Sequence, residues 1–368
     1  MQSKYSDIAA LFPIEGEITD IRPFGNGHIN DTLGVTVRTP EGTEEVRYVL
    51  QKINHNVFKD VDTLQHNIFT VTGHIRKKLE AEGDKDAGRH VLTFLHTKDG
   101  KEYCRYEGEY WRLMRFIKGS KSYEAVTPEL AREAGAAFGK FQAMLSDLPK
   151  GALGDTIPRF HDMAFRLEEL SEAVAKDAAG RVNEPEVKRL LEGIEARKSD
   201  MLIQDRLHAE GRLPLRTNHL DTKVNNVLFD EKTDEVLCVI DLDTVMPGFV
   251  TSDIGDFIRT AVNTGAEDEK DLSKIAVNME IFKAYTEGYL STAKAFLTTD
   301  EIKLLPYGGR LLTYMQTVRF LTDYINGDIY YKVEGPKHNL QRSVAQYEFL
   351  LRLEEKKEEM DAFVAQYL

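Results

Sequence analysis

Residues 217–229 read TNHLDTKVNNVLF and residues 239–243 read VIDLD, and both place polar side chains inside an apolar run. The first contains the spacing His-x-Asp-x-x-x-x-Asn, and the second ends a β-like run in two carboxylates. Phosphoryl transfer needs a carboxylate that positions and deprotonates the acceptor hydroxyl, together with an amide and a carboxylate that bind Mg²⁺. The pattern therefore predicts Asp221 as the catalytic residue and Asn226 and Asp241 as metal ligands.

Three other interpretations of these residues are open. An isolated His-x-Asp is most often a hydrogen-bonded turn, but the carboxylates downstream favour a chemical role. A metal-dependent hydrolase could instead be built from His219, Asp221, Asp241 and Asp243. Such centres usually use histidines at ligand spacing, and the other nine of the 10 histidines form no His-x-His or His-x-x-x-His pair. An inactive nucleotide-binding regulator is disfavoured because all three predicted kinase residues are present.

The pattern of apolar residues changes along the chain. The early part predicts a hairpin from residues 33–37 and 47–52, a helix over 60–82, and strands over 91–96 and 109–117. The later part predicts one β-like stretch at 215–242 and helices over 127–145, 161–176, 185–209, 255–263, 274–296, 300–325 and 338–366. We therefore expect an α+β protein in which strands and one helix precede a mainly helical part.

Composition and charge set the broad class. The 368 residues are 42% hydrophobic and 30% charged, which is close to ordinary globular usage. The formal net charge of -13 disfavours nucleic acid as a partner. Cys104 and Cys238 make no metal or redox spacing, as expected in a thiol-reducing compartment. The sequence shows neither a signal-peptide pattern nor a stretch of about 18 apolar residues, so we expect a cytoplasmic protein that does not enter a membrane.

Residues 219–226 and 240–243 resemble the catalytic and metal-binding segments of the aminoglycoside phosphotransferase (APH) superfamily of small-molecule kinases. Within it the pattern is most similar to the N-acetylhexosamine 1-kinases, in stretches at 25–30, 47–51, 245–248, 266–274 and 319–324. The resemblance implies ATP and Mg²⁺ as cofactors and a bilobed, protein-kinase-like fold. Its nucleotide-binding N-lobe, residues 1–117, is expected to be an antiparallel sheet plus a helix. Its larger, mainly helical C-lobe, residues 118–368, is expected to carry the catalytic loop and acceptor site.

The resemblance also implies where the nucleotide binds. Glycines between two strands let backbone N–H groups approach phosphate, and residues 114–117 resemble the hinge that holds adenine. Gln51 stands where kinases carry a phosphate-binding lysine and Lys52 follows one position late, so either side chain could meet phosphate. No acid that could pair with such a lysine occurs in residues 64–71. The expected nucleotide-binding residues are Gly25, Gly27, Gln51, Lys52, Met114 and Phe116.

For the acceptor, the resemblance points to His28 and to a segment near residue 319 that combines one cation with one acid and several phenols. A helix face whose arginine packs on acids is the alternative for that segment. Asp243 is a second candidate for sugar hydroxyls or metal, while Asp253 and His219 are expected to support the catalytic loop. The expected substrate-binding residues are His28, Asp221, Asp243, Arg319 and Tyr324, with Asp328, Tyr330 and Tyr331 nearby.

Together these features favour an ATP-dependent kinase that phosphorylates the anomeric hydroxyl of N-acetylglucosamine or N-acetylgalactosamine. Within the same superfamily, an aminoglycoside, homoserine, methylthioribose or choline acceptor is the nearest alternative. A strongly acidic acceptor region would favour an aminoglycoside, and the residues around Arg319 offer the opposite. We expect a small-molecule sugar and a nucleotide as partners, and a monomer or small homo-oligomer.

Overall fold

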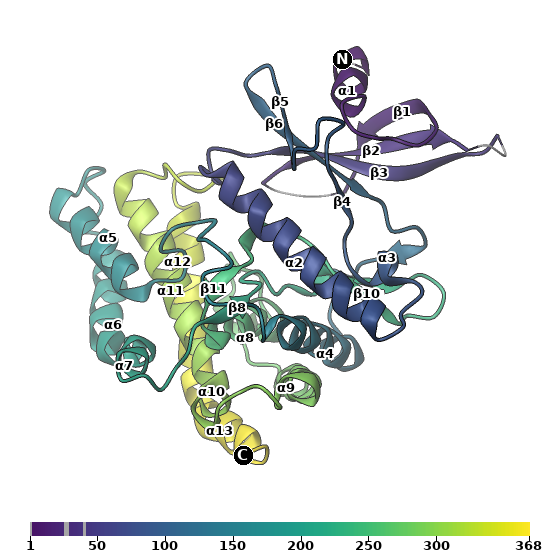
Figure 1. The fold of residues 1–368 in the computed structure, drawn as a ribbon. Helices are drawn as coiled ribbons and strands as arrows, with labels where there is room; N and C mark the ends of the chain where they lie inside the picture. Colours follow the sequence, from purple (N-terminus) through teal and green to yellow (C-terminus); the bar gives the residue numbers. More distant parts are fainter. Residues whose placement is uncertain (1, 26–28, 40–41) are drawn as a thin grey trace. The chain divides into compact units, whose positions relative to one another are not determined.

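The computed structural model describes residues 2–25, 29–39 and 42–368, and Figure 1 shows the order of their helices and strands. The chain divides into two compact units. The first comprises Met1–Tyr123, Met144–Pro158 and Asn225–Pro247, and the second comprises Glu124–Ala143, Arg159–Val224 and Gly248–Leu368. The chain therefore returns twice to the first unit, and its second return carries Asn226 and Asp241.

A six-stranded antiparallel sheet forms much of the first unit. Leu33 of β2 pairs with Leu50 of β3, which confirms the predicted hairpin. Alternate side chains of the sheet, including Tyr48 and Trp111, pack with α1 (Gln2–Ala9) in one apolar core. The strand order is β1 (Glu17–Pro23), β2 (Asp31–Arg38), β3 (Glu44–Ile53), β6 (Glu109–Arg115) and β4 (Phe94–Leu95), with β5 (Cys104–Tyr106) also paired to β6.

The remaining elements of the first unit are α2 (Val61–Ala81), α3 (Ala87–His90) and a small second sheet. Asp60 caps α2 by accepting a hydrogen bond from the Thr63 amide, 3.0 Å away. The predicted stripe of apolar residues on α2 is buried, which confirms this helix. The second sheet has the order β10 (Val236–Val239), β9 (Val227–Asp230) and β7 (Ser120–Lys121).

Helices form most of the second unit, and several are shorter than predicted. The predicted helix 185–209 breaks at Leu202, and 300–325 breaks at Leu304, just before a first turn that contains Pro306. The 274–296 helix begins only at its Asn278 cap. The helices are α4 (Pro128–Leu145, ending in the first unit), α5 (Met163–Lys176), α6 (Pro185–Met201), α7 (Ile203–Ala209), α8 (Val250–Phe257), α9 (Met279–Ala293), α10 (Thr299–Lys303), α11 (Leu305–Asn326), α12 (His338–Glu355) and α13 (Lys357–Ala365).

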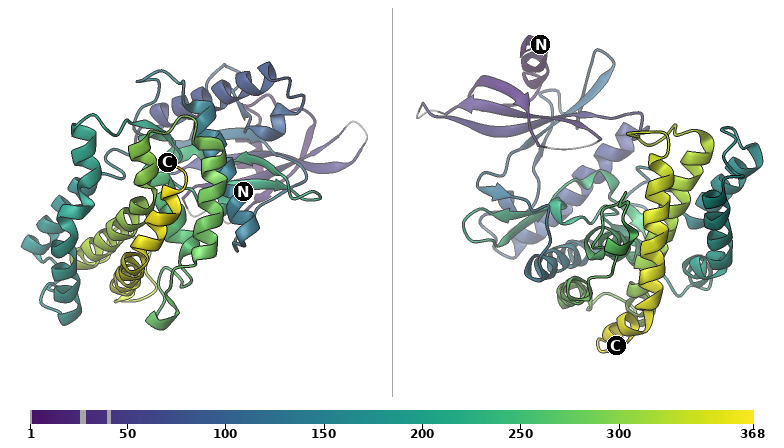
Figure 2. Two further views of the ribbon diagram at one scale, coloured as in Figure 1. Left: turned by 90° about the horizontal axis from the view of Figure 1, so that it is seen from below. Right: turned by 180° about the vertical axis from the view of Figure 1, so that it is seen from behind.

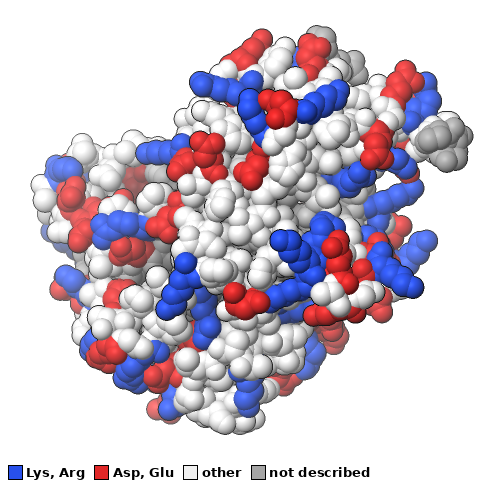
Figure 3. All heavy atoms as spheres, in the orientation of Figure 1, with Lys and Arg blue, Asp and Glu red and all other residues white. Residues whose placement is uncertain are grey.

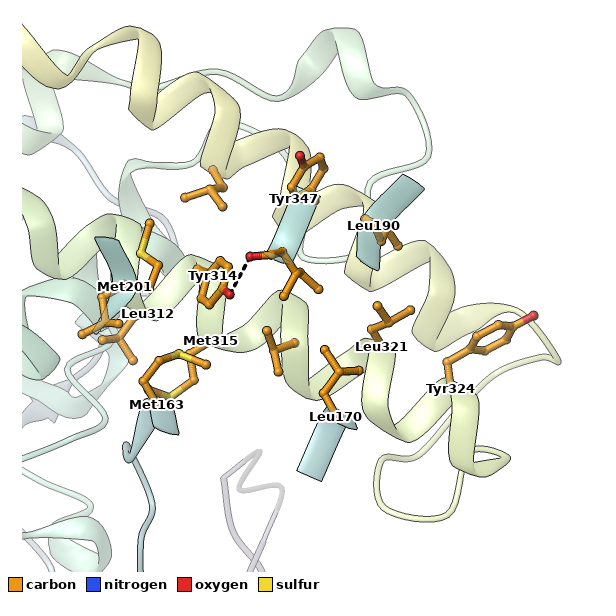
Figure 4. Close-up of a cluster of buried hydrophobic side chains, with 14 of the residues drawn as sticks. Met163, Leu170, Leu190, Met201, Leu312, Tyr314, Met315, Leu321, Tyr324 and Tyr347 are labelled. Carbon is orange, nitrogen blue, oxygen red and sulfur yellow. Dashed lines mark hydrogen bonds between the residues drawn. The ribbon is translucent and has the colours of Figure 1, made fainter. Parts of the chain in front are cut away.

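Helix α11 forms the centre of the second unit. It lies alongside α12 in both Figure 1 and Figure 2, and it also packs against α5 and α8. Figure 4 shows part of the apolar core on α11, where the Tyr314 hydroxyl donates to the Ile194 carbonyl oxygen at 2.9 Å. Helices α8 and α11 approach closely at Gly255 and Gly308, because a Cβ on Gly255 would overlap the Gly308 carbonyl oxygen. This approach fixes α8, which carries Asp253.

Charged side chains of both signs are interspersed on the face drawn in Figure 3. Within the part of the chain that the structure describes, no helix is long and apolar enough to cross a membrane.

Candidate active site

Asp253 on α8 holds the loop that carries Asp221. Its buried carboxylate accepts hydrogen bonds from the backbone N–H groups of His219 and Leu220, at 2.9 and 2.7 Å. The Gln142 amide donates to the same carboxylate at 2.6 Å. Burial raises the pKa of the Asp253 carboxyl, against the lowering effect of these hydrogen bonds. Asp253 therefore fixes the backbone two residues before Asp221.

His219 supports this loop from inside the second unit. Its fully buried ring makes edge contacts with Phe138 and Phe141 of α4, with centroids 5.3 and 5.8 Å apart. The Asp221 amide donates to its Nδ1 at 3.3 Å. His219 therefore orients the backbone of Asp221 and has an apolar environment.

Asp221 itself is partly accessible, with 24% of its side chain exposed. Leu220, just before it, has a φ of 64°, a left-handed conformation that costs energy for a residue other than glycine. Lys223 Nζ lies 2.8 Å from Asp221 Oδ1. Burial lowers the pKa of Lys223, but the charges of Asp221 and Asp256 outweigh it and the net shift is upward. The loop thus presents a carboxylate with a neighbouring cation.

Arg319 on α11 lies among aromatic rings. Its guanidinium carbon is 5.7, 6.0 and 5.6 Å from the ring centroids of Phe160, Tyr330 and Tyr331. Its Nη1 donates to the Gln316 amide oxygen at 3.2 Å. Among the described residues it forms no ion pair with a carboxylate. We call Phe160, His161, Arg319, Tyr330 and Tyr331 the arginine–aromatic cluster.

Asp323 holds the two tyrosines of this cluster in place. Its carboxylate accepts from the backbone N–H groups of Tyr330 and Tyr331 at 2.8 and 3.0 Å. The Asn339 amide also donates to it at 2.8 Å. The residues after α11 therefore turn back beside Arg319.

Tyr324 lies in the apolar core of α11 and is 1% exposed (Figure 4). Its hydroxyl donates to the Glu184 carboxylate at 3.0 Å, and the Arg181 guanidinium lies 4.2 Å from its ring centroid. Tyr324 follows Arg319 by five residues on α11, so the two side chains lie on different faces of the helix. This position does not suit the substrate contact that was expected of Tyr324. Asp328 likewise pairs with Arg181, at 2.6 Å.

In the first unit, the pairing of β9 with β10 places Asn226, just before β9, and Asp241, just after β10, at the same end of the hairpin. Val227 pairs with Val239, and the Ile240 amide donates to the Asn226 carbonyl oxygen at 2.9 Å. Asp241 follows Ile240 directly. Its left-handed φ of 59° turns the backbone out of the extended conformation of β10. The two expected metal ligands therefore lie at the same end of one hairpin.

Asp243 is held by a buried ion pair. Its Oδ1 lies 2.6 Å from Arg112 Nη1, and the two side chains are 4% and 3% exposed. Its Oδ2 accepts from the Asn30 amide at 2.6 Å, and Asn30 in turn accepts from the Asn54 backbone at 2.9 Å. Arg112 Nε also donates to the Gln51 amide oxygen at 3.0 Å. The turn after Asp241 is thus bound to β3, β6 and the start of β2.

Gln51 and Lys52 point to opposite faces of the main sheet. Gln51 pairs across the strands with Arg112 and shares its face, where Asp243 lies. Lys52 pairs with Trp111 on the α1 face and forms ion pairs with Asp31 and Glu109, at 2.6 and 3.4 Å. No bulge redirects Lys52 between β3 and β6, so strand alternation keeps it away from the Gln51 face.

The other expected nucleotide residues are placed as follows. Gly25 has a φ of 74°, in the left-handed region that glycine adopts freely, while Gly27 and His28 lie outside the described residues. Met114 lies in β6 opposite Val49. The Phe116 amide donates to the Arg47 carbonyl oxygen at 2.8 Å, so that N–H is not available to a nucleotide.

The donor set in the first unit fits a magnesium ion. Asn226 and Asp241 offer an amide and a carboxylate, and hard oxygen ligands of this kind suit Mg²⁺, which usually takes one or two carboxylates plus substrate phosphates. Across residues 2–25, 29–39 and 42–368, no three His, Cys, Asp or Glu side chains are grouped to hold a metal.

Sequence reasoning did not identify Arg112, Asn30, Gln142, His161 or Asp323. Arg112 and Asn30 contact Asp243 across 131 and 213 residues of chain, as the difference of their numbers shows, and no local pattern reports such contacts. A usable signal existed for Arg112, since a charged residue interrupts the apolar alternation of β6 at a position that the sheet buries.

Comparisons with known proteins identify the family and the fold of this chain. The model of the phosphotransferase enzyme family (APH) matches residues 20–292. An aminoglycoside phosphotransferase from Alicyclobacillus acidocaldarius is similar with a TM-score of 0.62 at 11% identity, covering 97% of this chain and 96% of that one. A microcompartment-associated aminopropanol kinase has a TM-score of 0.61 at 16% identity, covering 98% of both chains. The ADP-bound aminoglycoside phosphotransferase APH(2'')-Ib has a TM-score of 0.52 at 14% identity, covering 95% of this chain and 98% of that one. At these identities the likeness shows the fold, and the expected α+β, protein-kinase-like architecture is confirmed.

Proposed function

Because this chain belongs to the phosphotransferase enzyme (APH) family, we propose that it is a kinase that transfers the γ-phosphoryl group of ATP to the anomeric hydroxyl of an N-acetylhexosamine. Phosphoryl transfer follows from the family. ATP as donor is supported by the similar aminoglycoside phosphotransferase that contains ADP. The hexosamine acceptor rests on the sequence pattern and on the arginine–aromatic cluster.

The observation that carries the acceptor assignment is that Arg319 lies among aromatic rings and forms no ion pair with a carboxylate among the described residues. The similar aminopropanol kinase and aminoglycoside phosphotransferases are named for acceptors that carry amines, which are cationic at neutral pH. An arginine without a local carboxylate partner repels such acceptors. A neutral sugar suits it, because a guanidinium donates hydrogen bonds to hydroxyl and amide oxygens, and aromatic rings pack on sugar faces. The cluster therefore favours a neutral polyhydroxy acceptor.

In the reaction, Asp221 orients the anomeric hydroxyl and accepts its proton. The sugar oxygen forms a bond to the γ-phosphorus, the bond from that phosphorus to the bridging β-phosphate oxygen breaks, and ADP leaves. Asp253 and His219 keep Asp221 in position through the backbone. Asn226 and Asp241 would hold Mg²⁺, which when bound neutralises charge on the phosphates.

In the first unit, we assign the phosphate-facing side of the sheet to the face of Gln51 and Arg112. That face also holds Asp243, two residues after Asp241. Lys52 belongs to the opposite face. The family resemblance implies nucleotide roles for Gly25, Gly27 and Met114 and a sugar role for His28, and we keep these roles in the proposal. Gly27 and His28 lie outside the described residues.

An acceptor panel tests the proposal most directly. ADP release should be fast with N-acetylglucosamine or N-acetylgalactosamine and slow with aminoglycosides and amino alcohols. Asp221→Asn should lower turnover about 10²–10⁴-fold, since a general base is lost, with little change in ATP binding. Activity on a cationic acceptor alone would overturn the sugar assignment and leave the phosphotransferase standing.

Arg319→Ala tests the acceptor region separately. A lost charged hydrogen bond is worth about 1.5–3 kcal/mol, so the sugar KM should rise about 10- to 150-fold while the ATP KM stays constant. Arg189→Ala is the matched control, because Arg189 also lies over a tyrosine ring but pairs with Glu186 on an exposed face. An unchanged sugar KM in Arg319→Ala would make Arg319 a structural residue.

A further inference from the structure

The ring nitrogen Nδ1 of His161 is buried and has no hydrogen-bond partner among the residues that the structure describes. His161 lies just before α5, in the second unit. A buried polar atom without a partner destabilises the folded protein, and native proteins rarely keep one without a reason. A ligand that supplies the missing partner is one such reason.

The neighbours of His161 belong to the proposed acceptor region. Its ring stacks on Phe160, with centroids 4.3 Å apart and planes at 18°. Phe160 in turn lies under the Arg319 guanidinium, and its carbonyl oxygen accepts from Arg166 Nη2 at 2.9 Å. The unpartnered nitrogen is thus in the same cluster as Arg319.

Charges around His161 keep its ring neutral. Burial, followed by the charges of Arg319, Arg166 and Arg259, lowers the pKa of His161 to about 3, and the Asp221 carboxylate acts weakly in the other direction. These are the charged groups with the largest effects on the pKa of the ring, and Asp221 is the predicted catalytic carboxylate. A neutral imidazole has one donor and one acceptor nitrogen and therefore suits a hydroxyl group, which can be either.

We infer that His161 binds the acceptor, with Nδ1 hydrogen-bonded to a hydroxyl of a neutral polyhydroxy substrate beside Arg319 and Asp221. This inference rests on the proposed function and adds a residue and a ligand chemistry to it. Arg319 supplies donors only, so His161 provides the lone-pair acceptor that a sugar hydroxyl also needs. The free energy that the unpartnered nitrogen costs in the ligand-free protein is regained when substrate binds.

Two substitutions at this position separate binding from folding. In His161→Leu the nitrogen is removed, and we expect the acceptor KM to rise about 5- to 10-fold, as for the loss of one hydrogen bond, with the nucleotide KM unchanged. The melting temperature should not fall, because a polar atom without a partner is replaced by an apolar group. In His161→Asn the side-chain amide occupies the place of Nδ1 and should restore the acceptor KM to within about threefold of wild type.

His208→Leu is the matched control. His208 is also a histidine of the second unit, but it is exposed and its Nδ1 is hydrogen-bonded to the Leu213 carbonyl oxygen at 2.7 Å. This variant should melt at a lower temperature and keep its acceptor KM, which is the reverse of His161→Leu. The ratio of acceptor KM values for His161→Leu and wild type should also be constant from pH 5.5 to 8, since the ring stays neutral over that range.

An unchanged acceptor KM in His161→Leu, measured with an active wild type, would overturn the inference alone. A drop in melting temperature like that of His208→Leu, without rescue by asparagine, would also overturn it and make His161 structural. If wild type phosphorylates no hydroxyl compound of the panel, the proposed function falls and this inference falls with it.

Discussion

Asp253 in the second unit and Asp243 in the first are both buried carboxylates, but their partners differ in charge. Asp253 is bound by two backbone N–H groups and the Gln142 amide, all of which are neutral. Asp243 is bound by the Arg112 guanidinium and the Asn30 amide. Each carboxylate fixes a segment with an expected chemical role, the Asp221 loop in one unit and the Asp241 turn in the other.

The difference has two energetic consequences. A carboxylate held by neutral dipoles can be protonated without leaving a charge behind, so its effect on stability depends on pH. In a buried ion pair, protonation of the carboxylate leaves the cation unpaired, and removal of the cation leaves the carboxylate unpaired. The first unit is therefore more sensitive to removal of one partner, and the second is more sensitive to pH.

The largest effect is expected from Arg112→Met. It should lower the free energy of unfolding by about 3–5 kcal/mol, because Asp243 would keep a buried charge without its cation. Trp111, the only tryptophan of the chain, is next to Arg112 and 2% exposed, so its fluorescence during urea unfolding reports on the first unit.

The double variant Arg112→Met/Asp243→Asn controls this prediction. It has no unpaired buried charge, and at least about half of the lost stability should return. Lys52→Met, on the other face of the same strand pair, should cost only about 0–1 kcal/mol because its ion pairs are partly exposed. A double variant no more stable than Arg112→Met would show that the ion pair is not the cause.

A smaller effect is expected from Asp253→Asn, about 1–3 kcal/mol. The amide keeps one acceptor oxygen, but its NH₂ group faces the donors that the carboxylate now satisfies. Circular dichroism at 222 nm during urea unfolding is dominated by the second unit, which contains most of the helices. If the tryptophan signal shifts as far as the helical signal in this variant, the two units unfold together and the comparison between them fails.

Much of the fold follows from local patterns in the sequence. The apolar stripe of α2 and the paired strands β2 and β3 are confirmed because each buries one face, which fixes the period of the pattern. The pattern failed where long helices break without a change of polarity, as at Leu202 and Leu304. At those positions the backbone turns while the apolar faces on both sides continue into one core.

The site was accessible from sequence only in part. The spacing of Asp221 and Asn226 and the position of Asp241 are local features of a loop and a hairpin, so the chain order carries them. The environment of Arg319 is not local, since Phe160 lies 159 positions before it by residue number and Tyr331 follows it after a turn. Tyr324 illustrates the same limit. The residues next to it in the sequence do not indicate that its side chain on α11 lies in the apolar core.

A still smaller effect is expected from the titration of Asp253. Burial raises its folded pKa above the ordinary value of 3.8, so the folded protein binds this proton more tightly than the unfolded chain. The contribution to stability is full below pH 3.8 and is lost as the pH rises through the folded pKa. The stability difference between wild type and Asp253→Asn should therefore widen as the pH falls from 8 to 4. A difference that is constant with pH would show that Asp253 does not titrate in this range.

The smallest effect is expected at Asp230 in the first unit, where the shift has the opposite sign. A hydrogen bond from Arg89, at 2.8 Å, and the Lys232 and Thr233 amides lower the pKa of Asp230 to about 2. The folded protein therefore holds this proton less tightly, and stability from the group is present above pH 3.8 and lost as the pH falls toward 2. Asp230→Asn should melt slightly below wild type at pH 7, followed by Trp111 fluorescence, and the gap should narrow between pH 5 and pH 3. For Asp253→Asn, the stability difference from wild type is instead expected to widen as the pH falls. If this difference widened for both variants, the distinction between a carboxylate paired with a cation and one held by neutral groups would be contradicted.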